Sequence, residues 1–185
     1  MSFEADSEVT PLTPDEEAQL RALATDRAQE FVASLGAADT LESRFYALPD
    51  AALAAYRLGK LDCAVELAAE TLDVARRFQD SWNFGNALHL AHTVQGLVAL
   101  SRDEVGVAVA ELASAGATPG SPQLDSFGPS MELARALLKR GETEAVLKYL
   151  VQCRAFWKMG TTWLDLWEPM VRAGRVPNCL MNAYR

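Results

Sequence analysis

Three segments of the chain share one pattern, in which a helix ends at a tight turn and a second helix begins at once. The segments are LGKLDCAVEL, LSRDEVGVAVAEL and KRGETEAVLKYL. In each, a turn residue is followed five positions later by a small or branched apolar residue. The pairs are Gly59 and Ala64, Asp103 and Ala108, and Gly141 and Val146, and the turns lie 44 and then 38 residues apart. Helix–turn–helix units repeated at this spacing are typical of an α-solenoid, in which each unit packs on its neighbours.

The composition favours an all-α fold. Of the 185 residues, 31 are alanine and 25 are leucine, and half of the chain is hydrophobic. Alanine and leucine are strong helix formers, and a chain of this length can bury a core as one domain. We therefore predict an all-α solenoid of about three to four helical hairpins.

Start and stop signals divide the chain into individual helices. Thr13-Pro14-Asp15-Glu16 predicts a capped helix start, and Gly36 predicts the end of that helix. Pro49 is expected to end the next helix and to begin another, because proline is tolerated in a first turn but not in a helix interior. Further helices are expected over 49–58, 62–78, 82–100, 105–115, 129–140, 143–158 and 163–173.

The repeated segments resemble the tetratricopeptide-repeat (TPR) superfamily. In that family a glycine closes the first helix, an acidic residue follows in the turn, and small residues lie on the second helix, an order found in GKLDCA from Gly59 to Ala64. The resemblance covers roughly residues 48–160. From Trp82 to the C-terminus the chain is also similar to uncharacterised bacterial TPR-like proteins with a TPGSPQL-SFGP segment. The resemblance implies a TPR-like α-solenoid of bacterial origin, and it implies no activity.

The expected organisation has four parts. A flexible leader spans 1–12, N-terminal helices span 13–47, TPR-like repeats span 48–160, and a capping helix with a tail spans 161–185. The first helix is acidic, since residues 1–42 hold ten acidic and two basic side chains of a chain with net charge −8. Residues 126–185 hold nine basic and five acidic side chains. We expect the acidic helix to dock against this basic end, in its own chain or in a neighbour's as a homodimer.

Several partners and compartments are disfavoured by the sequence. The chain has no concentrated Lys/Arg cluster of the kind that binds phosphate backbones, so a nucleic-acid partner is not expected. It has no secretory signal and no apolar run of membrane-spanning length. Cys63, Cys153 and Cys179 have no CxxC spacing and fit reduced thiols. The sequence predicts a cytoplasmic protein without a membrane partner.

The segment TPGSPQLDSFGPS, residues 118–130, interrupts the helical pattern with three prolines and two glycines. Prolines restrict their own φ and the residue before them, so the segment is expected to be rigid, with Leu124 and Phe127 tucked under it. One interpretation is a connector that covers the core between two repeats. The other is a recognition loop at the mouth of a groove.

The two histidines lie on one helix, in NFGNALHLAHTVQG. Gly85, His89, His92 and Gly96 form a stripe between two apolar faces, and such a stripe either meets another helix closely or lines a cavity. Two histidines at this spacing lack the third ligand that a zinc site needs, and no catalytic or phosphate-binding motif accompanies them. We therefore expect no catalytic residue, no metal and no cofactor. The two histidines are expected to be either a pair of hydrogen-bonded structural residues or contacts for a ligand.

Aromatic residues gather near the C-terminus, where Phe156, Trp157, Trp163 and Trp167 fall within twelve residues. They can form a platform that grips a peptide or an apolar ligand. Alternatively, they close the open end of a solenoid, which needs a cap. We favour the cap.

The function expected from the sequence is a non-catalytic scaffold that binds a protein or peptide in the concave groove of its repeats. Arg57 is a further residue expected at this groove. The alternative is a small-molecule-binding protein or enzyme with a pocket between the histidine helix and segment 118–130. The candidate binding residues are Asn86, His89, His92, Thr93, Phe127 and Arg135.

Overall fold

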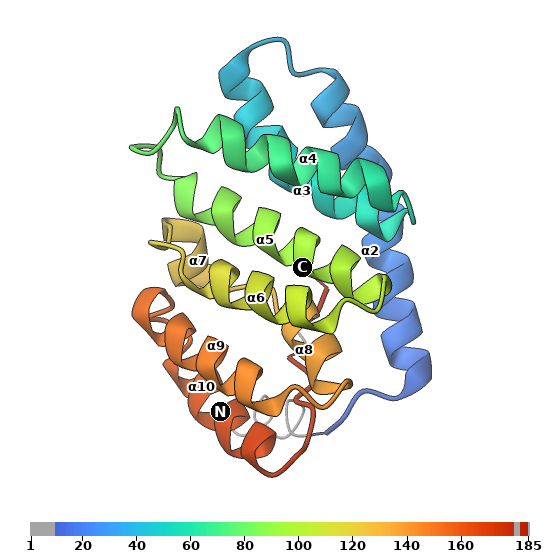
Figure 1. Ribbon diagram of the computed structural model, residues 1–185, viewed down its shortest axis with the longest axis vertical. Helices are drawn as coiled ribbons and strands as arrows, with labels where there is room; N and C mark the ends of the chain where they lie inside the picture. Colours follow the sequence, from blue (N-terminus) through green and yellow to red (C-terminus); the bar gives the residue numbers. More distant parts are fainter. Residues whose placement is uncertain (1–9, 180–181, 185) are drawn as a thin grey trace.

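The computed structural model describes residues 10–179 and 182–184, and this part of the chain is all-helical, as the composition predicts (Figure 1). No strand occurs among the described residues. Their nine helices are α2 (Pro14–Gly36), α3 (Leu41–Arg57), α4 (Leu61–Ala75), α5 (Phe84–Ser101), α6 (Val105–Gly116), α7 (Pro122–Phe127), α8 (Glu132–Leu138), α9 (Thr143–Phe156) and α10 (Thr161–Arg172). The leader expected over 1–12 lies mostly outside the described residues.

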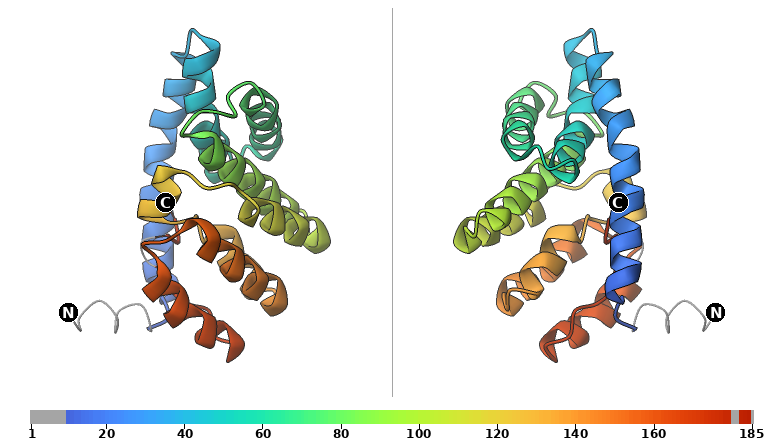
Figure 2. Two further views of the ribbon diagram at one scale, coloured as in Figure 1. Left: turned by 90° about the vertical axis from the view of Figure 1, so that its left-hand side faces the viewer. Right: turned by 90° about the vertical axis from the view of Figure 1, so that its right-hand side faces the viewer.

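Six helices form three consecutive pairs, α3 with α4, α5 with α6 and α8 with α9 (Figure 1). Each pair packs on the next pair along the chain, and α10 packs on α9. Helix α2 packs on α3 and then runs along one edge of the stack, past the later pairs (Figure 2). The acidic helix therefore lies beside segments that follow it by more than a hundred residues.

The turn within each pair has the same backbone geometry. The turn residue has a positive φ, which is 73° at Gly59, 63° at Asp103 and 87° at Gly141. The next amide donates a hydrogen bond to the carbonyl five residues earlier. These bonds join Lys60 to Ala55 at 2.9 Å, Glu104 to Ala99 at 2.9 Å and Glu142 to Leu137 at 3.1 Å. This closure satisfies a carbonyl at the end of the first helix and reverses the chain.

The small residues that the pattern places after each turn are fully buried. Ala64, Ala108 and Val146 lie in one hydrophobic core cluster, which extends through all three pairs to α10. Short side chains at these positions let the second helix of a pair approach the first closely, so that the core is packed at high density.

The expected helix break at Pro49 is wrong. Helix α3 continues from Leu41 to Arg57 with Pro49 in its interior, and Pro49 is buried. A proline there removes one helical hydrogen bond. The surrounding packing compensates, because Phe45 and Leu48 are fully buried and the Phe45 ring stacks on Phe78 at 4.6 Å. Tertiary contacts thus override a local helix-breaking signal.

Segment 118–130 lies between α6 and α8, and it contains a short helix, α7, that the sequence pattern did not predict. Ser121 caps α7 by accepting a hydrogen bond from the Leu124 amide at 3.0 Å, and Pro122 occupies the first turn. The expected helix over 129–140 begins only at Glu132, as α8. Leu124 is buried as predicted, but Phe127 is 63% exposed and does not tuck under the segment.

Hydrogen bonds hold this segment on the rest of the molecule. Thr118 Oγ1 donates to the Gly85 carbonyl of α5 at 2.7 Å. Asn182 in the C-terminal tail donates from Nδ2 to the Phe127 and Pro129 carbonyls at 2.8 and 2.9 Å. The observed contacts favour the connector interpretation over a recognition loop.

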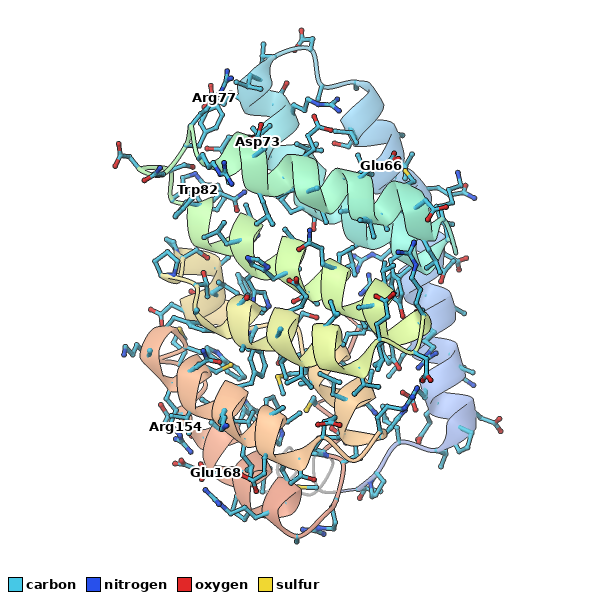
Figure 3. The ribbon with its side chains drawn as sticks, in the orientation of Figure 1. Glu66, Asp73, Arg77, Trp82, Arg154 and Glu168 are labelled. Atoms are coloured by element: carbon cyan, nitrogen blue, oxygen red, sulfur yellow. The ribbon has the colours of Figure 1, made fainter. Side chains whose placement is uncertain are left out.

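The C-terminal aromatic residues belong to the core, which agrees with the cap and not with an exposed platform. Phe156, Trp157 and Trp167 are buried, and the two indole rings lie 5.7 Å apart. On the outer side, Arg154 of α9 and Glu168 of α10 point toward each other and form a hydrogen bond at 3.0 Å (Figure 3). Helix α10 thus covers α9 with an apolar inner face and a charged outer one.

The turn geometry predicts opposite effects for two glycine substitutions. We expect Gly141→Ala to lower the free energy of unfolding by about 1 kcal/mol, because alanine is strained at positive φ. Gly106→Ala, in the exposed face of α6, is the matched control and should raise it by about 0.5–1 kcal/mol. In both places an added Cβ meets open space. Urea denaturation measures both values, and equal changes would contradict the role of the turn.

Candidate functional site

His89 is a structural residue at the centre of the molecule. Its side chain is buried, its Nε2 accepts a hydrogen bond from the Ser130 amide at 3.0 Å, and its Nδ1 lies 3.1 Å from the Ala115 carbonyl. An amide N–H only donates and a carbonyl only accepts, so the proton of the neutral ring is on Nδ1. Both ring nitrogens are therefore bonded to backbone groups, one at the end of α6 and one in segment 118–130.

The other candidates on α5 also make local contacts. His92 Nδ1 lies 2.7 Å from Glu111 Oε2 of α6, and Thr93 donates to the His89 carbonyl of its own helix at 2.8 Å. Asn86 Nδ2 donates to Asn83 at 3.2 Å. These side chains hold α5 and its neighbours in place.

The glycines of the stripe mark close contacts. A Cβ at Gly85 would lie 1.9 Å from the Gly120 carbonyl oxygen, and one at Gly96 would lie 2.3 Å from Cδ2 of Leu133. The expected close approach to another helix describes Gly96, which meets Leu133 of α8. Gly85 instead meets Gly120 of segment 118–130, which is not helical there.

A small cavity does lie between α5 and segment 118–130. It has a volume of about 80 Å³, and Asn86 and His89 contribute to its lining. Pockets for small organic ligands usually enclose about 300–1,000 Å³, so this space suits a few water molecules. Phe127 and Arg135 are absent from its lining. The six candidate residues therefore do not share one groove.

A larger cavity of about 410 Å³ lies between α2, the first helices of the three pairs and the C-terminal tail. The sequence pattern did not predict this cavity as a site, although two residues expected at a groove, Arg57 and Arg135, line it. The lining residues are Glu17, Arg21, Ala24, Thr25, Tyr56, Arg57, Leu61, Leu97, Leu100, Ser101, Glu132, Arg135, Ala136, Lys139, Arg140 and Tyr184. Five of these side chains are cationic and two are carboxylates, so the cavity carries an excess of positive charge.

Glu17 of α2 is the centre of a charged network at one side of this cavity. Lys139 Nζ lies 2.6 Å from both carboxylate oxygens of Glu17, and Arg135 Nη1 lies 3.3 Å from Oε1. The Tyr184 hydroxyl also donates to Glu17. The acidic helix thus docks on basic residues of its own chain, one of the two arrangements expected from the charge distribution.

This network changes the ionisation of Glu17. Burial by itself raises the pKa of Glu17, but hydrogen bonds from Lys139 and Tyr184 and the charges of Arg135 and Lys139 outweigh burial and lower the pKa to about 2. Glu17 is therefore a carboxylate throughout the physiological pH range.

Aromatic contacts fix the cationic side chains of the network. The Arg21 and Arg135 guanidinium carbons lie 5.4 and 5.8 Å from the centre of the Tyr184 ring. Arg135 is buried, and its Nε donates to the Pro177 carbonyl at 3.1 Å. Cation–π contacts and a backbone acceptor hold Arg135 in one orientation.

A second charge pair also lines the cavity. Arg57 Nη2 of α3 donates to Glu132 Oε2 of α8 at 2.9 Å, and both side chains are about nine-tenths buried. Burial raises the pKa of Glu132 despite the neighbouring Arg57 charge. The pair links the first helices of the first and third pairs.

No protein-family model matches the chain, and no curated protein or solved structure matches it either. Within residues 10–179 and 182–184, no three His, Cys, Asp or Glu side chains are grouped so that they can hold a metal ion. In the same residues, no helix combines the length and the apolar character needed to cross a bilayer.

The double hydrogen bond of His89 predicts its effect on stability. His89→Leu leaves the Ser130 amide and the Ala115 carbonyl without their ring partner, and should lower the free energy of unfolding by about 2–4 kcal/mol. His92→Gln, on the same helix but partly exposed, should change it by less than about 1 kcal/mol. Urea denaturation of both variants measures the difference, and similar values for the two would contradict the structural role of His89.

The lowered pKa of Glu17 predicts a specific dependence on pH. Since the folded-state pKa is about 2 and the ordinary value is 4.5, ionised Glu17 stabilises the fold above pH 4.5, and this contribution is lost as the pH falls through 2. Glu17→Gln should lower the free energy of unfolding by about 1–2 kcal/mol at pH 7. The difference between wild type and variant should shrink steadily below pH 4.5 in denaturation series. A difference that is the same at pH 7 and pH 3 would contradict the assignment.

Proposed function

We propose that the protein is a non-catalytic TPR-like α-solenoid that binds an acidic segment of a protein or peptide partner. The segment's carboxylates would enter the cavity between α2, the first helices of the three pairs and the C-terminal tail. The excess of cationic side chains in this cavity is the observation that carries the proposal.

The repeated geometry supports the solenoid part of the proposal. In each of the three pairs, a turn with the same positive-φ closure joins the two helices, and the pairs pack on one another in chain order. In α-solenoids, the first helices of such units line an extended concave surface on which partners bind. Here α3, α5 and α8, the first helices of their pairs, all contribute residues to the cavity.

The lining favours binding over chemistry. Its polar side chains are mainly arginine, lysine, tyrosine, serine and threonine, and histidine and cysteine are absent from the lining. Its two carboxylates, Glu17 and Glu132, are both in ion pairs with cationic side chains of the lining. Arginine and tyrosine are well suited to hold carboxylates by charge-assisted hydrogen bonds. The alternative pocket beside His89 is less well supported, because it encloses only about 80 Å³ and both nitrogens of its histidine are bonded to the backbone.

A labelled peptide of six glutamates tests the proposed function by fluorescence polarisation. We expect binding that weakens with added salt, and much weaker binding of the corresponding glutamine peptide. Arg140→Gln, at the cavity, should weaken binding about three- to tenfold, since it removes one charge from a partly exposed position.

Arg172→Gln is the matched control for this variant. Arg140 is paired with the carboxylate of Asp103, and Arg172 is likewise a partly exposed arginine paired with a carboxylate, Glu168. Arg172 lies on α10 and not in the cavity. Its substitution should leave the affinity unchanged. Equal affinity for the glutamate and glutamine peptides, or equal effects of the two arginine variants, would refute the proposed function.

A further inference from the structure

We propose that the amino-terminal half of α2 is a displaceable strap over the cationic cavity, and that the Glu17 carboxylate occupies the position which a carboxylate of the ligand takes on binding. This inference rests on the proposed function. It assigns the ligand's carboxylate site to Arg135, Lys139 and Tyr184, and it makes α2 an internal competitor for that site.

The two halves of α2 are attached to the molecule in different ways. The carboxyl-terminal half packs on α3, where Ala28 is buried and Leu35 contacts the cluster around Phe45. No residue between Pro14 and Leu23 is buried, and Leu23 is mostly exposed. The first half is held by polar side chains, chiefly Glu17 and Arg21. Segments with few buried apolar contacts open at low free energy, so the first half can separate while the second half stays in place.

Arg135, the most buried partner of Glu17, is held by contacts outside α2. Arg135 is fixed by the Pro177 carbonyl, with its guanidinium carbon 5.8 Å from the centre of the Tyr184 ring. Lys139 follows directly on α8, at the closed turn before α9. These donors converge on one carboxylate, and they would converge in the same way on another.

Opening of the strap and binding of the ligand are coupled through the charges of Arg135 and Lys139. When Glu17 leaves, the buried Arg135 and the neighbouring Lys139 lose the carboxylate that compensates them, which is unfavourable in a site of low dielectric. An incoming carboxylate restores this compensation, so displacement exchanges one ion pair for another. Arg21 leaves with α2, and the cavity of about 410 Å³ beneath the helix becomes open to the rest of the ligand.

With an internal competitor, the apparent affinity equals the intrinsic affinity multiplied by the fraction of molecules in which the strap is open. Loosening the strap should therefore tighten binding. Glu17→Gln is the direct variant, since it keeps the size of the side chain and removes its charge. Asp26→Asn is the matched control, because Asp26 is an exposed carboxylate on the same helix and does not line the cavity.

The six-glutamate peptide serves as the probe for wild type and both variants. We expect Glu17→Gln to bind it about fivefold more tightly than wild type, and Asp26→Asn to bind it like wild type. Hydrogen exchange, followed by mass spectrometry, should show faster exchange of the amides of 14–23 in Glu17→Gln than in wild type. Addition of the peptide to wild type should also speed exchange there, while α5 stays protected.

The exchange measurement separates displacement from a simple charge effect. If removal of one negative charge alone improves binding, the peptide leaves exchange over 14–23 unchanged or slows it, and this result overturns the strap. Equal affinities of wild type and Glu17→Gln also overturn it, while peptide binding itself upholds the proposed function. If no variant binds the glutamate peptide in preference to the glutamine peptide, the proposed function fails and the strap fails with it.

Discussion

The closed turn inside each helix pair is the constraint on which the rest of the structure depends. A backbone with positive φ at Gly59, Asp103 and Gly141 lets each chain reversal finish within a few residues. The second helix then returns against the first, with a small buried residue at the contact. Because the same reversal occurs three times, α3, α5 and α8 follow one another in contact, and together they line the large cavity. The position of the candidate site is thus a consequence of turn geometry.

The third pair departs from the other two, and the connector compensates for the difference. Its first helix, α8, has 7 residues, whereas α3 has 17 and α5 has 18. Segment 118–130 lies against α5 beside this short helix, with α7 and α8 both in contact with α5. His89 bonds to Ser130 at the end of the segment and to Ala115 at the end of α6. A histidine that looked like a candidate for ligand contact is therefore part of the scaffold.

Charge joins segments that packing alone would leave separate. Glu17 meets Arg135, Lys139 and Tyr184 across more than a hundred positions of sequence. The acidic excess of residues 1–42 and the basic excess of 126–185 predicted this kind of contact, because opposite charges on two surfaces favour docking. They did not identify the residues, since a net charge carries no information about which side chains converge.

The sequence by itself determined the all-α class, the positions of the three turns and most helix starts, because these depend on neighbouring residues through propensity, capping and backbone conformation. It misjudged Pro49, whose local preference yields to the packing of Phe45 and Leu48, and it missed α7. Only the tertiary structure decided which polar side chains lie in contact with one another. His89 lies in the core, and Arg135 lies in a cavity with Glu17. Burial and ion pairing depend on distances between segments that are far apart in the sequence, so a local sequence pattern does not predict them.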